Sequence, residues 1–160
     1  MAQKVYLTMK GARSGEVRGD ANKDHAIAVM AVSHEITAGR ELASGAGTGK
    51  RQHFPIRITK EVDGSTPILL QMLATSEVIV SWKLDFFEPN VQGVEKNYYR
   101  IELINAQVFS YKFTQPNSKE DGGKRAGYEE VAFNYQKITW VAVDKGITAS
   151  DDWDGSDLNG

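Results

Sequence analysis

Apolar and polar residues alternate along much of the chain, which is the pattern of β-strands with one buried face. Near the start, Val5, Leu7 and Met9 alternate with Tyr6 and Thr8. The clearest alternation puts five apolar residues on one predicted face, at Val78, Val80, Trp82, Leu84 and Phe86. Shorter faces follow the same period at Ile56 and Ile58, at Tyr99, Ile101 and Leu103, and at Phe109, Tyr111 and Phe113. The pattern predicts a mainly β protein.

The phase of this alternation changes once near the end of the chain. Apolar positions are odd-numbered at Val131, Phe133 and Tyr135 and even-numbered at Ile138 and Trp140. Such a change predicts either a bulge or a strand whose two halves bury opposite faces. Residues 26–36 show no readable period, but their valines favour a buried strand over a helix.

One segment carries the signals of a helix. Ser65 or Thr66 can cap the exposed N–H groups, and Pro67 suits the first helical turn. Apolar residues then share one face at helical spacing, at Ile68, Leu69, Met72 and Leu73. We expect a helix of about ten residues that depends on the sheet beneath it for stability.

Glycine-rich and polar segments predict the connections. Residues 38–52 contain four glycines and predict a long flexible segment, and residues 116–125 predict a polar connection. The acidic tail, residues 150–160, is predicted to be loose. Since neither a repeat nor a linker is visible, residues 1–160 predict a single domain, a compact β-barrel or β-sandwich with one short α-helix.

Composition narrows the classes of function. The 160 residues are 41% hydrophobic and include 15 aromatic residues, enough for one core. Nineteen Lys and Arg against 21 Asp and Glu give a net charge of −2, which argues against a dedicated nucleic-acid binder and gives no reason to expect an anionic membrane partner. The absence of cysteine excludes disulfides, thiolate nucleophiles and cysteine-ligated metals.

Targeting signals are also missing. The longest apolar run, Ala26–Val32, is far shorter than the ~20 residues that span a bilayer. Lys4 and Lys10 flank only a few apolar residues, so no conventional signal peptide is predicted. We expect synthesis in the cytoplasm and no membrane insertion.

Loop motifs that bind phosphate or calcium are incomplete. The segment from Ser44 to Arg51 resembles a phosphate-binding loop, but the motif requires glycine at position 44 and Ser or Thr at position 51. In the acidic tail, a calcium loop aligned on Gly155 runs out of chain before its bidentate glutamate. A mobile loop and a solvated tail are the predicted alternatives.

Side chains suited to catalysis are dispersed. The three histidines, His25, His34 and His53, are too scattered in sequence to indicate a metal or catalytic cluster. Glu129 and Glu130 are adjacent on a predicted strand, and we expect both to be solvated. No catalytic, cofactor-binding or metal-binding residue is predicted, and the chain is not expected to be an enzyme.

A local basic cluster leaves two interpretations open. It comprises Lys50, Arg51, Arg57 and Lys60. It is either a solvated face or a contact surface for an acidic patch on a neighbouring subunit, for which the acidic tail is one candidate.

The order and spacing of several motifs resemble the Hcp family, the haemolysin-coregulated proteins that form the tube of bacterial type VI secretion systems. The block T-K-x-x-D-x-S-T-P-x-L at residues 59–69 is the most specific. The others are V-Y-L-T-M-K-G at 5–11, A-V-S-H-E-I at 31–36, Y-Y-R-I-E-L-I-N-A-Q-V-F-S-Y at 98–111 and E-E-V-A-F-N-Y-Q-K-I-T-W at 129–140.

This resemblance implies a fold similar to phage tail tube proteins, with six subunits in a ring and rings stacked into a tube. Its implied partners are the spike protein, the contractile sheath and effector proteins carried in the lumen, and its implied fate is export through the type VI apparatus. By the same analogy, the Gly-rich loop would contact the next ring or subunit through Gly45, Gly47, Gly49, Lys50 and Arg51.

Two alternatives from other classes stay open at this point. A ligand-binding β-sandwich of the carbohydrate-binding type would use exposed Trp82, Trp140 or Trp153 as a platform. An enzyme would use the Gly-rich loop and Lys50 to bind a nucleotide.

Overall fold

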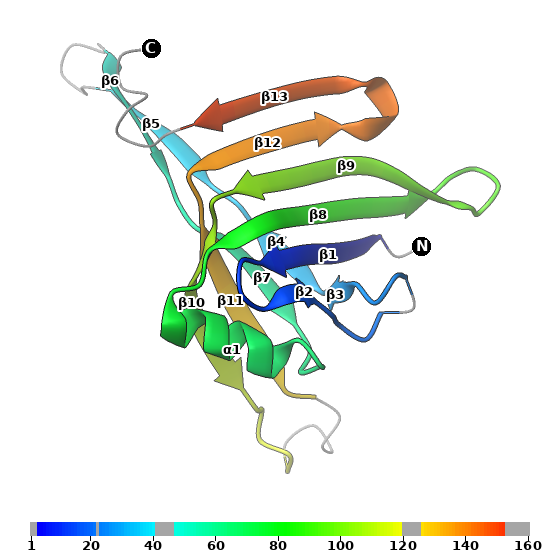
Figure 1. The fold of residues 1–160 in the computed structure, drawn as a ribbon. Helices are drawn as coiled ribbons and strands as arrows, with labels where there is room; N and C mark the ends of the chain where they lie inside the picture. The colour runs from blue at the N-terminus through cyan, green and yellow to red at the C-terminus, as the bar shows by residue number, and fades with distance from the viewer. Residues whose placement is uncertain (1–2, 22, 41–46, 120–125, 153–160) are drawn as a thin grey trace.

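Two antiparallel β-sheets pack face to face, with one helix beside them (Figure 1). The computed structural model describes residues 3–21, 23–40, 47–119 and 126–152. The seven-stranded sheet has the order β13 (Ile147–Asp152), β12 (Lys137–Ala142), β9 (Glu95–Ile104), β8 (Ile79–Pro89), β1 (Lys4–Gly11) and β2 (Gly15–Val17), with β3 (Ile27–Val29) also paired to β1. The four-stranded sheet has the order β10 (Gln107–Thr114), β11 (Tyr128–Asn134), β7 (Ile56–Lys60) and β4 (Ala31–Ser33). A third pair consists of β5 (Ile36–Arg40) and β6 (Gly47–His53).

The core lies between the two larger sheets. Leu7 and Leu84 of the seven-stranded sheet and Ile58 of the four-stranded sheet are fully buried. The Trp82 and Phe133 rings meet edge-on across the interface, with their centroids 5.4 Å apart. Among the described strands no pairing closes either sheet on itself, so the predicted mainly β fold is confirmed in its sandwich form.

Bulges overturn the predicted faces at two positions. Val80 is 51% exposed rather than buried, because the register with β1 shifts there and Ile79 enters the core instead. Phe109 is 54% exposed for the same reason, since a shift in the β10–β11 register leaves Val108 as the buried neighbour. A bulge adds one residue to a strand and so reverses the side-chain phase beyond it.

Residues 26–36 do not form the single strand that was predicted. They form β3, β4 and the start of β5, which belong to three different sheets. The chain crosses from the seven-stranded to the four-stranded sheet at Met30, whose N–H donates to the Thr59 carbonyl at 2.7 Å. A continuous apolar run here supplies strands to both walls of the core.

The change of phase near Gln136 marks another crossing. β11 belongs to the four-stranded sheet, and β12, which begins only three residues after β11 ends, belongs to the seven-stranded sheet. Phe133 and Ile138 are both fully buried, although they have opposite phases. Neither predicted form, a bulge or a single strand with two halves, occurs, because the segment forms two strands that contact the core from different sheets.

The predicted helix is α1 (Thr66–Thr75), which lies beside β10 (Figure 1). Leu69 and Met72 are fully buried. Ser65, one of the two predicted caps, does not cap the helix with its side chain. Its hydroxyl donates to the Asp63 carboxylate instead. At the other end Ser76 adopts the left-handed conformation, with φ +53°. No helix in the described residues is long and apolar enough to cross a membrane.

Candidate functional site: the arm and its base

β5 and β6 pair only with each other among the described strands and form an arm at one end of the sandwich (Figure 1). Residues 38–40 and 47–52 are therefore strands, and the prediction of a long flexible segment is wrong for them. Of the residues implied to contact the next ring, four lie in β6, at Gly47, Gly49, Lys50 and Arg51, and Gly45 lies outside the described residues.

A carboxylate of β13 holds the base of this arm. The Arg51 Nε donates to Asp151 Oδ2 at 2.6 Å, and Arg51 Nη2 donates to the Asp152 carbonyl at 2.9 Å. His53 Nε2 lies 2.7 Å from the same Asp151 oxygen. The hydrogen bond from Arg51, supported by the one from His53, lowers the pKa of Asp151 although burial alone would raise it.

The contacts of His53 fix its tautomer. A carboxylate only accepts hydrogen bonds, so Nε2 carries a hydrogen and donates to Asp151. Its Nδ1 lies 2.7 Å from the Tyr135 hydroxyl, which donates to Nδ1 when the ring is neutral. Burial, with the Asp151 charge, raises the pKa of Tyr135, so this hydroxyl stays protonated. The imidazole is thus a buried connector between β6, β13 and Tyr135.

His34 lies on the other strand connection at the arm's base. Its ring is 6.3 Å from the Trp140 ring, and its Nε2 is buried without a partner in the described part of the chain. Burial, and then the nearby His53, lower the pKa of His34, which favours the neutral ring. The structure therefore brings two of the scattered histidines near each other, yet no group of three potential metal ligands exists among the described residues.

The basic cluster does not form one surface. Arg51 contacts an acidic residue of its own chain, and that residue, Asp151, is ordered in β13 although a loose tail was predicted from residue 150. Arg57 is exposed, whereas Lys60 is fully buried. Residues 153–160 lie outside the described residues. Sequence reasoning linked the cluster to the acidic tail but missed His53 and Tyr135, which no local motif connects.

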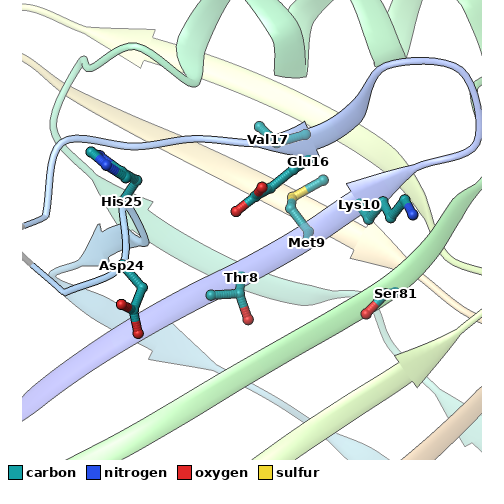
Figure 2. A pocket seen from close by; sticks show the side chains of 8 residues that line it. All are labelled: Thr8, Met9, Lys10, Glu16, Val17, Asp24, His25 and Ser81. Carbon is teal, nitrogen blue, oxygen red and sulfur yellow. The ribbon is translucent and has the colours of Figure 1, made fainter.

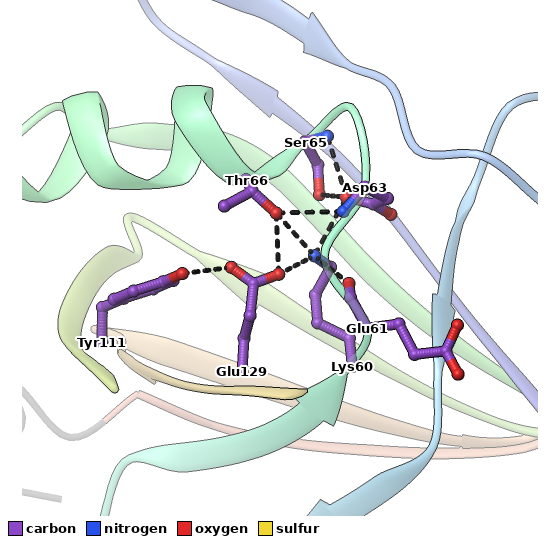
Figure 3. A network of polar contacts seen from close by, with 7 residues as sticks. All are labelled: Lys60, Glu61, Asp63, Ser65, Thr66, Tyr111 and Glu129. Carbon is purple, nitrogen blue, oxygen red and sulfur yellow. Dashed lines mark hydrogen bonds and ion pairs between the residues drawn. The ribbon is translucent and has the colours of Figure 1, made fainter. Parts of the chain in front are cut away.

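Lys60 and Glu129 form a buried ion pair, shown in Figure 3, although Glu129 was predicted to be solvated and Lys60 to lie on a solvated face or a contact surface. Lys60 Nζ lies 2.5 Å from Glu129 Oε1 and 2.9 Å from Asp63 Oδ1. Glu129 also accepts hydrogen bonds from Thr66 Oγ1 at 2.7 Å and Tyr111 Oη at 2.5 Å. The network joins β7, β10, β11 and the start of α1, and every charge in it has an opposite partner, as structural networks require.

A hollow of about 180 Å³ on the seven-stranded sheet has a lining of mixed polar and apolar side chains (Figure 2). Lys10, Glu16, Asp24 and His25 line it. Among the described residues these side chains form no hydrogen bond with one another. Of the tryptophans predicted as a sugar platform, Trp82 is buried and Trp140 is half-buried, so neither of these two offers an exposed ring face, and Trp153 lies outside the described residues.

Comparison with known proteins gives a family and a close curated relative. The family model described as "Type VI secretion system effector, Hcp" matches residues 6–141. The "Major exported protein" of Pseudomonas aeruginosa is 28% identical over 166 residues, which cover 96% of each chain.

Solved structures share the fold over nearly the whole chain. A structure described as an Hcp protein superposes with a TM-score of 0.88 at 22% identity, covering 95% of this chain and 98% of the other. A mutant form of the Hcp1 protein from E. coli gives 0.83 at 28% identity, covering 95% and 99%. The secreted Hcp3 protein of Pseudomonas aeruginosa gives 0.74 at 24% identity, with the same coverage.

Proposed function

The chain belongs to the Hcp family of type VI secretion proteins, and on that premise we propose that it is a structural subunit of the secretion tube rather than an enzyme. Six copies form a ring, and rings stack into a tube inside a contractile sheath beneath a spike protein. The subunit leaves the cell through the same apparatus, and the lumen carries effector proteins. The family match over residues 6–141 is the observation that carries the proposal.

Surface chemistry supports assembly. Large apolar side chains remain about half exposed or more at several described positions, including Met30, Val62, Phe109, Phe113 and Ile147. Phe109 and Phe113 lie on β10, an edge strand of the four-stranded sheet. Exposed apolar side chains at a strand edge are a liability in a monomer and are typical of surfaces that contact another chain.

The arm is our candidate for contacts between rings. It stands apart from both larger sheets, and its outer part contains Gly47 and Gly49 in β6. The contact set Gly45, Gly47, Gly49, Lys50 and Arg51 is retained in this proposal, with one difference. Arg51 supports the arm indirectly, because its guanidinium contacts Asp151 of the same chain.

Light scattering after gel filtration tests the proposal, with negative-stain images of the same peak. We expect a mass near six subunits of 17.7 kDa and annular particles. The variant Phe113→Asp places a charge on the exposed edge and should reduce the hexamer fraction, whereas Lys83→Asp on the outer face of the other sheet is the matched control. A monomer at every concentration would overturn the proposal.

A further inference from the structure

The arm has no backbone pairing with either large sheet among the described strands, so something else must set its direction. At its root, Phe54 N–H donates to the Glu35 carbonyl at 3.1 Å, which prolongs the pairing inside the arm but does not join it to the sandwich. Side chains of β6 contact β13 at two neighbouring residues: the Asp151 carboxylate accepts from Arg51 and His53, and the Asp152 carbonyl accepts from Arg51. Besides the two short chain connections, polar contacts of Arg51 and His53 thus link the arm to the sandwich, and the Asp151 carboxylate takes part in two of them.

The chemistry of this link is directional. Asp151 receives two hydrogen bonds from groups two residues apart on β6, Arg51 and His53, which lie on the same face of that strand. Two contacts on one face resist both bending and rotation of the strand. The His53 side chain is 1% exposed, so water replaces its hydrogen bond to Asp151 poorly, whereas the Arg51 and Asp151 side chains are 31% and 25% exposed. Charge-assisted hydrogen bonds in such a setting are strong ones.

We propose that Asp151 is a latch that fixes the direction of the β5–β6 arm relative to the seven-stranded sheet. Arg51 and His53 are the arm residues that bind this carboxylate, and the Tyr135 hydroxyl contacts the other ring nitrogen of His53, Nδ1. When the carboxylate is removed, the arm keeps its own backbone pairing but turns about residues 34–35 and 54–55. The latch is an intramolecular property, and only its use in ring stacking rests on the proposed function.

The absence of cysteine makes a direct test possible. Cysteines introduced at Ala38 on the arm and Lys145 on the sandwich, both exposed, accept spin labels at two unique positions. Double electron–electron resonance then reports the distance between arm and sandwich, with labelled protein diluted in excess unlabelled protein so that each assembly holds one labelled chain.

In the parent, we expect one narrow peak in the distance distribution between the two labels. In Asp151→Ala this single peak should be lost, while the circular dichroism spectrum stays unchanged. Glu102→Ala, on β9 of the same sheet and separated from β13 by β12, is the matched control and should keep the narrow peak. A narrow, unshifted peak in Asp151→Ala would overturn the latch. If Asp151→Ala does not fold, Arg51→Gln provides the same test with half of the link removed.

Non-additivity is the second readout. Arg51 and His53 share the Asp151 carboxylate, but Arg51 also donates to the Asp152 carbonyl, which Asp151→Ala retains. Arg51→Gln should therefore broaden the peak less in the Asp151→Ala background than in the parent. Equal broadening by Arg51→Gln in the two backgrounds would contradict the latch. Tube length in negative stain separates this inference from the proposed function. If the peak broadens and tubes stay as long as in the parent, the latch stands and the role of the arm in stacking falls.

Discussion

Burial of charge at Lys60 and Glu129 is the largest difference between sequence and structure at the scale of single residues. On β7, Lys60 shares the phase of the buried Ile58. A lysine close to Arg57 in the sequence is nevertheless expected at the surface. Its partner lies 69 positions away and pairs with it only because β7 and β11 are neighbours. Burial of this kind depends on strand order, which the local pattern does not contain.

Removing one member of this pair should be costly. Lys60→Met leaves the Glu129 carboxylate buried without its main cation and should lower the free energy of unfolding by about 3–5 kcal/mol. The double variant Lys60→Met, Glu129→Leu should recover most of this loss. Urea denaturation at neutral pH measures both, with the exposed Lys112→Met as control. A single variant as stable as the parent would contradict the structural role of the pair.

Trp140 provides a prediction that the structure revises. The strand phase predicts a buried side chain, whose removal would cost about 3–5 kcal/mol. The ring is instead half-buried against the core and beside His34. Trp140→Ala should therefore lower the free energy of unfolding by about 2 kcal/mol, against about 3–5 kcal/mol for the fully buried Trp82→Ala. Equal losses in the two variants would show that Trp140 is as deeply packed as Trp82.

Elements are predictable from sequence wherever strand pairing is regular. β1, β7, α1 and the Trp82–Phe86 part of β8 follow their apolar periods. The predictions fail at Val80 and Phe109 because a bulge is a relation between two strands, and the extra residue shows only when the partner's register is known. They also fail at residues 26–36, where one apolar run contributes strands to both of the sheets that enclose the core.

The end of α1 offers a stabilising change. Ser76 adopts φ +53°, a conformation that suits glycine and costs a serine free energy. Ser76→Gly should raise the free energy of unfolding by about 0.5–1 kcal/mol. Thr75→Gly, one residue earlier and inside the helix, should lower it by a similar amount. Thermal or urea unfolding of the two variants measures the contrast, and a destabilised Ser76→Gly would refute this account of the helix end.

The arrangement of the whole molecule is only partly contained in the sequence. The glycines of residues 38–52 locate the arm, but they also suggest flexibility where β5 and β6 pair. The base of the arm joins His53, Tyr135 and Asp151, which are separated by up to 98 positions. No spacing rule relates such residues, since the sandwich alone brings them together.

Bulky residues on the arm test its role in assembly. Gly47→Leu and Gly49→Leu should leave the subunit folded, because both positions lie on the arm and outside the core, and should shorten the stacked tubes. Tube length in negative stain and the circular dichroism spectrum are the measurements. Ala12→Leu adds the same bulk at an exposed turn and serves as control. Tubes of parental length in both arm variants would remove the arm from the stacking contact.

The strand order of the seven-stranded sheet also has a consequence for synthesis on the ribosome. β9 pairs with β8 as soon as both have emerged, but its other neighbour is β12, which is made about 30 residues later. At ordinary elongation rates this interval lasts a few seconds, during which the nascent chain exposes an open strand edge beside an apolar face. Nascent chains of this protein should therefore be most prone to aggregation, and most dependent on chaperones, in that interval.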